Sequence, residues 1–319
     1  MDNKKYIIVM GPTGVGKSDL AIEAAQFLSG EIINGDVGQF YTPFGIGTAK
    51  PEWRNEPVTH HLFDVIDEPI DCTVVSYRSM VQNALDQVWS KKRIPLIVGG
   101  SGFYLQSLFF PPLSFDDADH AHVSEVSIDS SVEKTWHNLK KYDSERAAQI
   151  DPHDSYRIDR AFEFMINSGK KASFFNPIYN PLCGQGLVIF CARERTELYD
   201  RIDARVLHMM QSGWKHEVEL LLDTPWENFL LRKKLIGYPD IIKYLRGDTE
   251  TQDFESVVTE IQKKTRHYAK RQSTFWRAFE KKVQPYMINN NLVLKTVNLS
   301  LENSRQEFMK LIKDFCDVT

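Results

Sequence analysis

The chain has 319 residues, of which 42% are hydrophobic and 26% are charged, and its formal net charge is -4. This length and composition predict a globular protein of one large or two modest domains and exclude a fibrous or disordered class. The slightly negative charge excludes a uniformly basic nucleic-acid-binding protein, so any such site must be a local patch. The four cysteines lack the paired spacing of a zinc site, and no apolar run approaches the roughly 20 residues that span a bilayer. We therefore expect a cytoplasmic protein that acts without a membrane.

The first third of the chain alternates short apolar runs with longer amphipathic segments. The short runs predict buried strands at residues 4–10, 31–35 and 94–100. Helical spacing of apolar residues predicts helices at residues 18–28, at residues 73–93 and from residue 103 onward. Strands that alternate with helices indicate βαβ units. The predicted fold class is therefore α/β, a parallel sheet flanked by helices on both faces.

This alternation stops near Pro111. Residues 111–132 are rich in Asp, Ser and His, and two helical segments without an intervening strand follow, at residues 136–150 and 155–169. We therefore predict an all-helical insertion domain at residues 112–183, within a main domain formed by residues 1–111 and 184–319. The main domain resumes with a predicted strand at residues 187–192, three helices at about 195–212, 215–223 and 255–282, and a peripheral helix or strand within 283–319.

A complete P-loop pattern, G-x-x-x-x-G-K-[ST], lies between the first predicted strand and the first predicted helix. Its residues are Gly11, Pro12, Thr13, Gly14, Val15, Gly16, Lys17 and Ser18. In such a loop, backbone N–H groups and the helix N-terminus converge on phosphate oxygens. Lys17 adds a positive charge, and the Ser18 hydroxyl can ligate Mg²⁺. The pattern predicts a diphosphate site and leaves the reaction open.

One acidic residue, Asp36, follows a predicted strand at the ligand-binding edge of the sheet. A P-loop phosphotransferase usually has an acid at the end of a second strand, but the strand at 94–100 ends in Gly99 and Gly100, followed by Ser101. Asp36 could therefore hold Mg²⁺ through water or accept a proton from a nucleophile. A simple turn cap is the alternative for this side chain.

The segment at residues 261–282 holds eight Lys or Arg residues and a single acid, Glu280. Helical spacing places several of these cations near one face, beside aromatic side chains. This arrangement suits the phosphate backbone of a nucleic acid. An ordinary solvated helix face is an equally simple interpretation of the charge run alone.

Eight sequence blocks, in order between about residue 7 and residue 277, resemble the tRNA dimethylallyltransferase family of bacterial type, also called tRNA isopentenyltransferases. The blocks are GPTGVGKSDLA, INGDVGQFY with GIGTAKP, HHLFDVIDEP, IPLIVGGSGFYLQSL, IDPHDSYRIDRAFEF, LYDRIDARVLHMM, IGYPDIIKYLRG and TRHYAKRQSTFWR. The resemblance implies transfer of a dimethylallyl group from dimethylallyl diphosphate to N6 of the adenine 3′-adjacent to the anticodon in tRNA. The product would be N6-isopentenyladenine.

The resemblance also implies roles for individual residues. The P-loop would hold the donor diphosphate, with Mg²⁺ bound at Ser18, and either Arg201 or Arg205 would bind the same diphosphate. Asp36 would contact N6 as general base, and Ser101 would lie near the leaving diphosphate. The partner would be the tRNA anticodon stem-loop, and we expect a monomer. The implied tRNA contacts are Asp36, Val37, Gly38, Gln39, Tyr156, Arg157, Ile158, Asp159, Arg160, Lys263 and Arg266.

Several positions depart from the family pattern. Val37 and Gly38 stand where the family usually has Ser and a larger residue, which removes one hydroxyl contact to the target base. Ser101 replaces Thr and keeps the hydroxyl, whereas His267 replaces Gln. The insertion also looks shorter and more acidic at residues 114–129, with His122 where an arginine is expected. These departures affect tRNA recognition and leave the donor site intact.

Two other functions fit part of the same pattern. A nucleoside or nucleotide kinase would share the P-loop and parallel sheet and would use ATP. The missing acid after the strand at 94–100 and the basic helix count against it. A non-catalytic RNA-binding P-loop protein would explain the divergence at Val37 and Gly38. The presence of Lys17, Asp36 and Ser101 together counts against that second alternative.

Overall fold

The computed structural model describes residues 4–112, 126–129, 131–174, 177–248, 253–289 and 291–317. Residues 114–125, including His122, lie outside the described residues. Contacts divide the chain into two compact units, one formed by residues 1–108 and 182–319 and the other by residues 109–181.

The larger unit is built on a six-stranded sheet whose paired strands are all parallel. The strand order is β3-β2-β4-β1-β5-β6, so the P-loop strand β1 lies at the centre, between β4 and β5. Each residue of β1 is buried, which explains why the segment is a continuous apolar run. The strand bounds are β1 Lys5–Met10, β2 Glu31–Asn34, β3 His60–His61, β4 Pro95–Gly99, β5 Gln185–Ala192 and β6 Leu292–Asn298.

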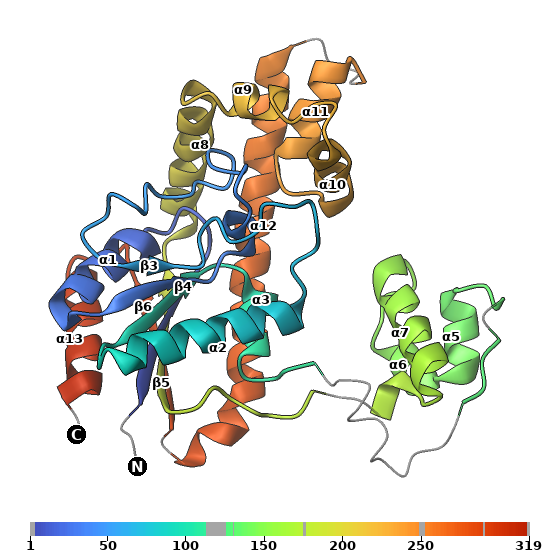
Figure 1. The fold of residues 1–319 in the computed structure, drawn as a ribbon, viewed down its shortest axis with the longest axis horizontal. Helices are drawn as coiled ribbons and strands as arrows, with labels where there is room; N and C mark the ends of the chain where they lie inside the picture. Colours follow the sequence, from blue (N-terminus) through green and yellow to red (C-terminus); the bar gives the residue numbers. More distant parts are fainter. Residues whose placement is uncertain are drawn as a thin grey trace. The chain divides into compact units, whose positions relative to one another are not determined.

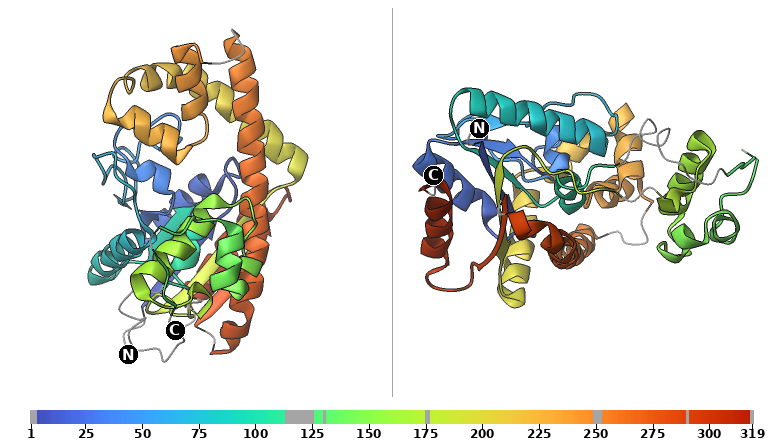
Figure 2. Two further views of the ribbon diagram at one scale, coloured as in Figure 1. Left: turned by 90° about the vertical axis from the view of Figure 1, so that its right-hand side faces the viewer. Right: turned by 90° about the horizontal axis from the view of Figure 1, so that it is seen from below.

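Helices cover both faces of this sheet, which confirms the predicted α/β class (Figures 1 and 2). Alternate residues of β1 divide between the faces: Ile7 and Val9 join a core cluster that includes residues of α1, α8 and α13. On β5, the Phe190 ring stacks on Trp276 of α12 at a centroid distance of 4.9 Å. The helix bounds are α1 Lys17–Leu28, α2 Val74–Ser90, α3 Gly102–Ser107, α8 Arg195–Gln211, α9 Trp214–Glu219, α10 Pro225–Lys233, α11 Tyr238–Arg246, α12 Phe254–Val283 and α13 Ser304–Asp317.

The region between α8 and the long basic helix contains more helices than the sequence predicted. The sequence predicted a single helix there, at 215–223. Helix α9 ends at Glu219, and two further helices, α10 and α11, precede α12. Thr224 ends the preceding segment because its hydroxyl caps α10, which begins with Pro225. Long α12 begins at a true cap, since the Asp253 carboxylate accepts hydrogen bonds from two backbone N–H groups of its first turn.

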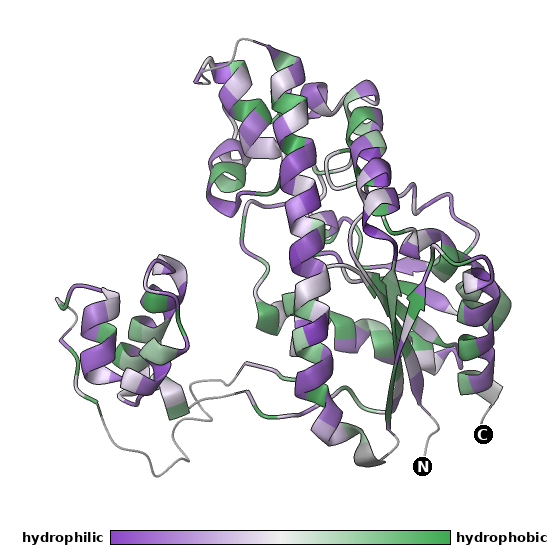
Figure 3. Cartoon of the chain, turned by 180° about the vertical axis from the view of Figure 1, so that it is seen from behind, coloured by the Kyte–Doolittle hydropathy of each residue, from purple (hydrophilic) through white to green (hydrophobic). Residues whose placement is uncertain are grey.

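The helices and the sheet of the larger unit differ in hydropathy. Figure 3 shows hydrophilic bands along α12 and predominantly hydrophobic strands in the sheet. Among the described residues, no helix combines the length and the apolar character that crossing a membrane requires.

The smaller unit contains helices only among its described residues, as the sequence pattern predicts. Its helices are α5 Trp136–Tyr142, α6 Ser144–Ala148, α7 Ser155–Ser168 and the short 3-10 helix η2 Ala172–Phe174. The prediction of one helix at 136–150 was wrong, because Asp143 interrupts it. The Asp143 carboxylate accepts from the N–H of Arg146 to start α6 and from the N–H of Ser173 in η2. The chain therefore forms two short helices, and Asp143 caps the second one.

Candidate active site

The P-loop connects the central strand β1 to α1 and turns through two left-handed glycines. Gly14 has φ 79° and Gly16 has φ 99°, a region that residues with a Cβ rarely adopt. A Cβ on Gly14 would also lie 3.0 Å from Cγ1 of Ile202. These two positions give the loop the shape in which backbone N–H groups point toward a bound anion.

Lys17, the first residue of α1, is only 8% exposed. Burial lowers the pKa of its ammonium below the usual value, and the nearby carboxylate of Asp36 opposes that shift. The Nζ atom lies 3.9 Å from Oδ2 of Asp36. A buried cation beside one carboxylate has little water to screen it, so it can act strongly on a diphosphate.

Asp36 lies where β2 ends, next to the carboxyl end of β4. Its Oδ1 accepts hydrogen bonds from the Gly100 N–H at 2.6 Å and from the Ser101 hydroxyl at 3.2 Å. Ser101 Oγ in turn accepts from the Val37 N–H at 3.3 Å. Although Asp36 precedes the 3-10 helix η1 (Val37–Phe40), its side chain makes no capping hydrogen bond. The geometry therefore disfavours the simple cap and holds Oδ2 toward Lys17.

Gln272 of α12 joins the P-loop to this carboxylate, a connection that the sequence analysis missed. Its Oε1 accepts from the Thr13 N–H at 2.9 Å, and its Nε2 donates to the Gly100 carbonyl at 2.8 Å. Both backbone polar groups of Gly100 are thus held, the carbonyl by Gln272 and the N–H by Asp36. One turn earlier on α12, burial and the Asp36 charge raise the pKa of Tyr268 to about 12.

Three arginines surround the P-loop, and they have different neighbours. Arg201 Nε donates to the Gly14 carbonyl at 2.8 Å, whereas Arg205 lies beside Thr13, with Nη1 3.5 Å from Oγ1. Burial lowers the pKa of the Arg205 guanidinium. Arg205 lines the pocket formed beside the P-loop, whereas Arg201 is not among the lining residues. Arg193, which the sequence analysis also missed, donates to the Val15 carbonyl and pairs with Glu197. Its position directly after the strand at 187–192 was the available signal.

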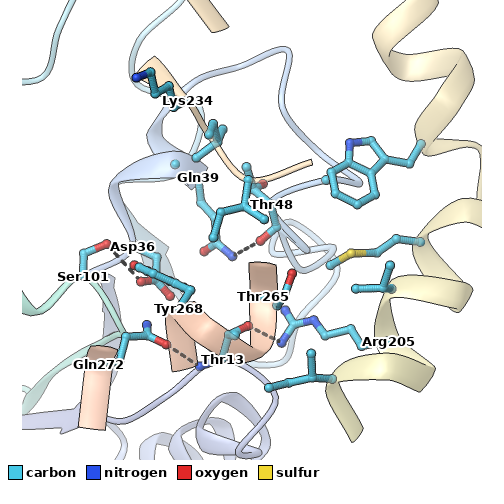
Figure 4. A pocket seen from close by; sticks show the side chains of 18 of the residues that line it. Thr13, Asp36, Gln39, Thr48, Ser101, Arg205, Lys234, Thr265, Tyr268 and Gln272 are labelled. Atoms are coloured by element: carbon cyan, nitrogen blue, oxygen red, sulfur yellow. Dashed lines mark hydrogen bonds between the residues drawn. The ribbon is translucent and has the colours of Figure 1, made fainter. Parts of the chain in front are cut away.

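These elements enclose a pocket of about 310 Å³. Figure 4 shows Thr13, Arg205, Asp36, Ser101, Tyr268 and Gln272 around its polar part. The rest of the wall is mixed, and its apolar part comes from α8, α9 and the segment after α10. Its apolar members are Ile202, Val206, Met209, Trp214, Leu235 and Ile236. One pocket thus combines a phosphate loop, a carboxylate and an apolar wall.

The chain is similar to known proteins along most of its length. Residues 39–279 match the family described as IPP transferase. The chain belongs to this family. A tRNA dimethylallyltransferase of Alkaliphilus metalliredigens is 33% identical over 94% of this chain and 97% of its own, and one of Bacillus subtilis is 35% identical over 87% and 90%. A solved eukaryotic dimethylallyltransferase acting on tRNA is 27% identical, with a TM-score of 0.75, over 98% of this chain and 79% of its own.

The segment after Asp36, which is predicted to contact tRNA, only partly lines the pocket. Gly38 and Gln39 line the pocket, whereas the Val37 side chain is buried. Gln39 Nε2 donates to the carbonyls of Thr48 at 3.0 Å and Ala49 at 3.2 Å. Its amide is therefore held in one orientation at the pocket wall.

The predicted contacts at residues 156–160 lie on α7 of the smaller unit. Tyr156 is 72% exposed, and Arg157 and Arg160 are exposed; Arg157 pairs with the capping residue Asp154, and Arg160 pairs with Glu163 of the same helix. The prediction for Ile158 needs correction, since this residue is 3% exposed and packs in the helical core. Its apolar side chain is part of the amphipathic stripe that folds α7. Asp159 is half-buried.

The two basic residues predicted on α12 both have acidic partners. Arg266 Nη1 lies 2.5 and 2.7 Å from the two carboxylate oxygens of Asp203, and Lys263 Nζ lies 3.3 Å from Glu260. Lys234 and Arg271, which the sequence analysis did not name, are exposed and line the pocket.

The described residues contain no cluster of three or more metal-binding acidic, His or Cys side chains. Ser18 is exposed at the start of α1 and lies outside the pocket lining.

We expect the two candidate diphosphate arginines to behave differently. Arg205→Ala should weaken donor binding and slow transfer, because the guanidinium lies in the pocket beside Thr13 and Lys17. Arg201→Ala removes a support for the Gly14 carbonyl and should have the smaller effect on donor affinity. Titration calorimetry with the diphosphate donor measures both. A larger loss for Arg201→Ala would reverse the assignment.

Proposed function

We propose that this chain transfers a dimethylallyl group from dimethylallyl diphosphate to N6 of the adenine 3′-adjacent to the anticodon in tRNA, giving N6-isopentenyladenine. The observation that carries the proposal is the 3.9 Å approach of Lys17 Nζ to Asp36 Oδ2 within one pocket. The P-loop cation suits a leaving diphosphate, and the carboxylate suits an incoming amine. A cytoplasmic location, where tRNA is available, follows from this substrate.

The leaving-group side of the reaction is served by positive charge and N–H donors. The C1–O bond of the donor breaks, and the diphosphate departs with the electron pair. Lys17 and Arg205 line the pocket beside Thr13 of the P-loop, and their charges and the loop amides would stabilise the negative charge that develops there. Mg²⁺ would be held by the Ser18 hydroxyl and by diphosphate oxygens, and would neutralise part of the same charge. Ser18 fits this role, since it stands exposed at the end of the loop.

The acceptor side is served by Asp36. The N6 lone pair forms the new C–N bond while Oδ2 of Asp36 takes the N6 proton, so charge and atoms balance. Gly100 and Ser101 hold the other oxygen, which fixes the direction of Oδ2. Because the adenine is stacked in an anticodon loop, it must be extruded to reach this position.

The apolar wall favours an isoprenoid donor over ATP. Ile202, Val206 and Met209 offer no hydrogen-bond partners for a ribose or a base, whereas a hydrocarbon tail gains from burial there. In addition, β4 is followed by Gly100 and Ser101, with no acid to hold the metal of a phosphotransferase.

Donor binding tests this choice. Dimethylallyl diphosphate, its non-allylic isomer isopentenyl diphosphate and ATP would be compared by calorimetry, and each would then be mixed with unmodified tRNA. We expect both isoprenoid diphosphates to bind and only the allylic one to modify the tRNA, because only its cation is delocalised. Preferential ATP binding with phosphoryl transfer would instead establish a kinase.

The basic residues at the pocket are expected to contact the tRNA backbone. Lys234→Glu and Arg271→Glu should raise the KM for tRNA, and each lost phosphate contact should reduce the salt slope by about 1. Lys263→Glu and Arg266→Glu should have smaller effects, because acidic neighbours already pair with both cations. The KM for tRNA at several salt concentrations decides between the two pairs. A larger rise in KM for Lys263→Glu and Arg266→Glu would instead place the RNA-binding surface on the side of α12 that carries these two residues.

A further inference from the structure

Glu217 on α9 binds three consecutive backbone N–H groups of a distant loop. Its Oε2 accepts from Gly45 at 2.9 Å and Ile46 at 2.6 Å, and its Oε1 accepts from Gly47 at 3.1 Å. The Tyr238 hydroxyl also donates to Oε1, at 2.7 Å. Successive N–H groups that converge in this way form an anion-binding concavity, and here the protein's own carboxylate occupies it.

The loop is also fixed by packing. A Cβ on Gly47 would lie 2.0 Å from Nε1 of Trp214, so the indole sits directly against this backbone. The loop backbone thus lies between the Glu217 carboxylate and Trp214, both on α9. Gly47 and Thr48 line the pocket, whereas Glu217 does not. Glu217 therefore acts on a bound substrate indirectly, and the loop that it holds is the connection to the pocket.

The loop acts in turn on Gln39. The carbonyls of Thr48 and Ala49 accept from Gln39 Nε2, and Figure 4 shows the Gln39 amide turned toward Thr48. Because the nitrogen is committed to the loop, Oε1 is the atom that the side chain can offer to a ligand. Gln39 also follows Asp36 closely, since its N–H donates to the Asp36 carbonyl at 2.9 Å.

We propose that Glu217 is a positioning residue for the acceptor base. It fixes residues 45–49, whose carbonyls orient Gln39 so that Oε1 accepts one N–H of the adenine amino group while Asp36 takes the other proton. This inference rests on the proposed function. It adds a second polar contact to N6 in a chain that has Val37 and Gly38, which have no side-chain hydrogen-bonding group, directly after Asp36.

Single-turnover transfer and donor affinity test the inference together. Glu217→Ala should slow transfer by about 10- to 100-fold, the size of effect expected from a misplaced reacting group. Affinity for dimethylallyl diphosphate should stay unchanged, because the P-loop is not part of this network. Glu217→Gln keeps the volume and one acceptor oxygen but places its NH2 group against a donor that the lost oxygen had accepted from, so it should slow transfer as well. Glu219→Ala is the matched control, since it removes an exposed carboxylate from the same helix.

Rescue by formate separates positioning from folding. The vacated N–H groups of Glu217→Ala should bind this small carboxylate, and Gly45 and Ile46 also line a second pocket of about 500 Å³ that gives it access. We expect formate to restore much of the transfer rate of Glu217→Ala and none of the rate lost in Asp36→Asn. Unimpaired transfer by both Glu217 variants, or a loss of donor binding in proportion to the loss of rate, would overturn the inference. Failure of the wild-type chain to transfer would instead refute the proposed function.

Discussion

Replacing Asp36 with asparagine is expected to slow transfer of the dimethylallyl group by about 10²–10⁴-fold, the usual contribution of a general base. Asparagine keeps an acceptor for the Gly100 N–H, so the turn between β4 and α3 should persist. It places a neutral amide where Oδ2 now faces Lys17 and cannot take the N6 proton. Donor affinity should therefore be nearly unaffected, which calorimetry and single-turnover kinetics can measure on the same preparation.

A metal-anchoring role for Asp36 makes a different prediction. Donor affinity would then fall together with the rate, and both would recover partly at high Mg²⁺ concentration. Measuring Asp36→Asn at two Mg²⁺ concentrations distinguishes the roles. Metal rescue would mean that Asp36 is not the base and that the amine loses its proton to solvent or to the departing diphosphate.

Lys17→Ala should weaken donor binding and slow transfer together. The ammonium is buried at the start of α1, so its attraction for a diphosphate is poorly screened in the bound state and during bond breaking. Loss of one such donor typically costs about 10²–10³ in rate. The donor dissociation constant and the single-turnover rate are the measurements.

A matched variant, Lys310→Ala, removes an exposed lysine from α13 and should change neither quantity. Donor affinity that survives Lys17→Ala would show that the P-loop does not hold the diphosphate. The Asp36 carboxylate loses its nearest cation in this variant, so thermal unfolding should be recorded as well.

The parts of the site that sequence could predict are those encoded by neighbouring residues. The P-loop is a contiguous pattern with glycines at its left-handed positions, and Asp36 and Ser101 each follow a recognisable strand. The alternation of strands and helices likewise predicted the parallel sheet. In these cases the local pattern and the tertiary structure impose the same requirement.

The parts that sequence reasoning missed depend on contacts between distant segments. Gln272 meets Thr13 across 259 positions, and Glu217 meets Gly45 across 172. No local periodicity encodes such pairs. The burial of Ile158 and the partner of Arg266 were missed for a related reason, since a motif or a charge run does not show which side of a helix packs. The break at Asp143 was hidden because the carboxylate that caps α6 is also held by the N–H of Ser173, 30 positions away.

The most direct test of the central claim is transfer to a defined adenine. The protein would be mixed with dimethylallyl diphosphate, Mg²⁺ and an unmodified anticodon stem-loop, and the product digested and analysed by mass spectrometry. We predict a single dimethylallyl group on N6 of the adenine 3′-adjacent to the anticodon, and no product when inosine, which lacks that amine, takes its place. A wild-type protein that binds both substrates but leaves this adenine unmodified would contradict the account.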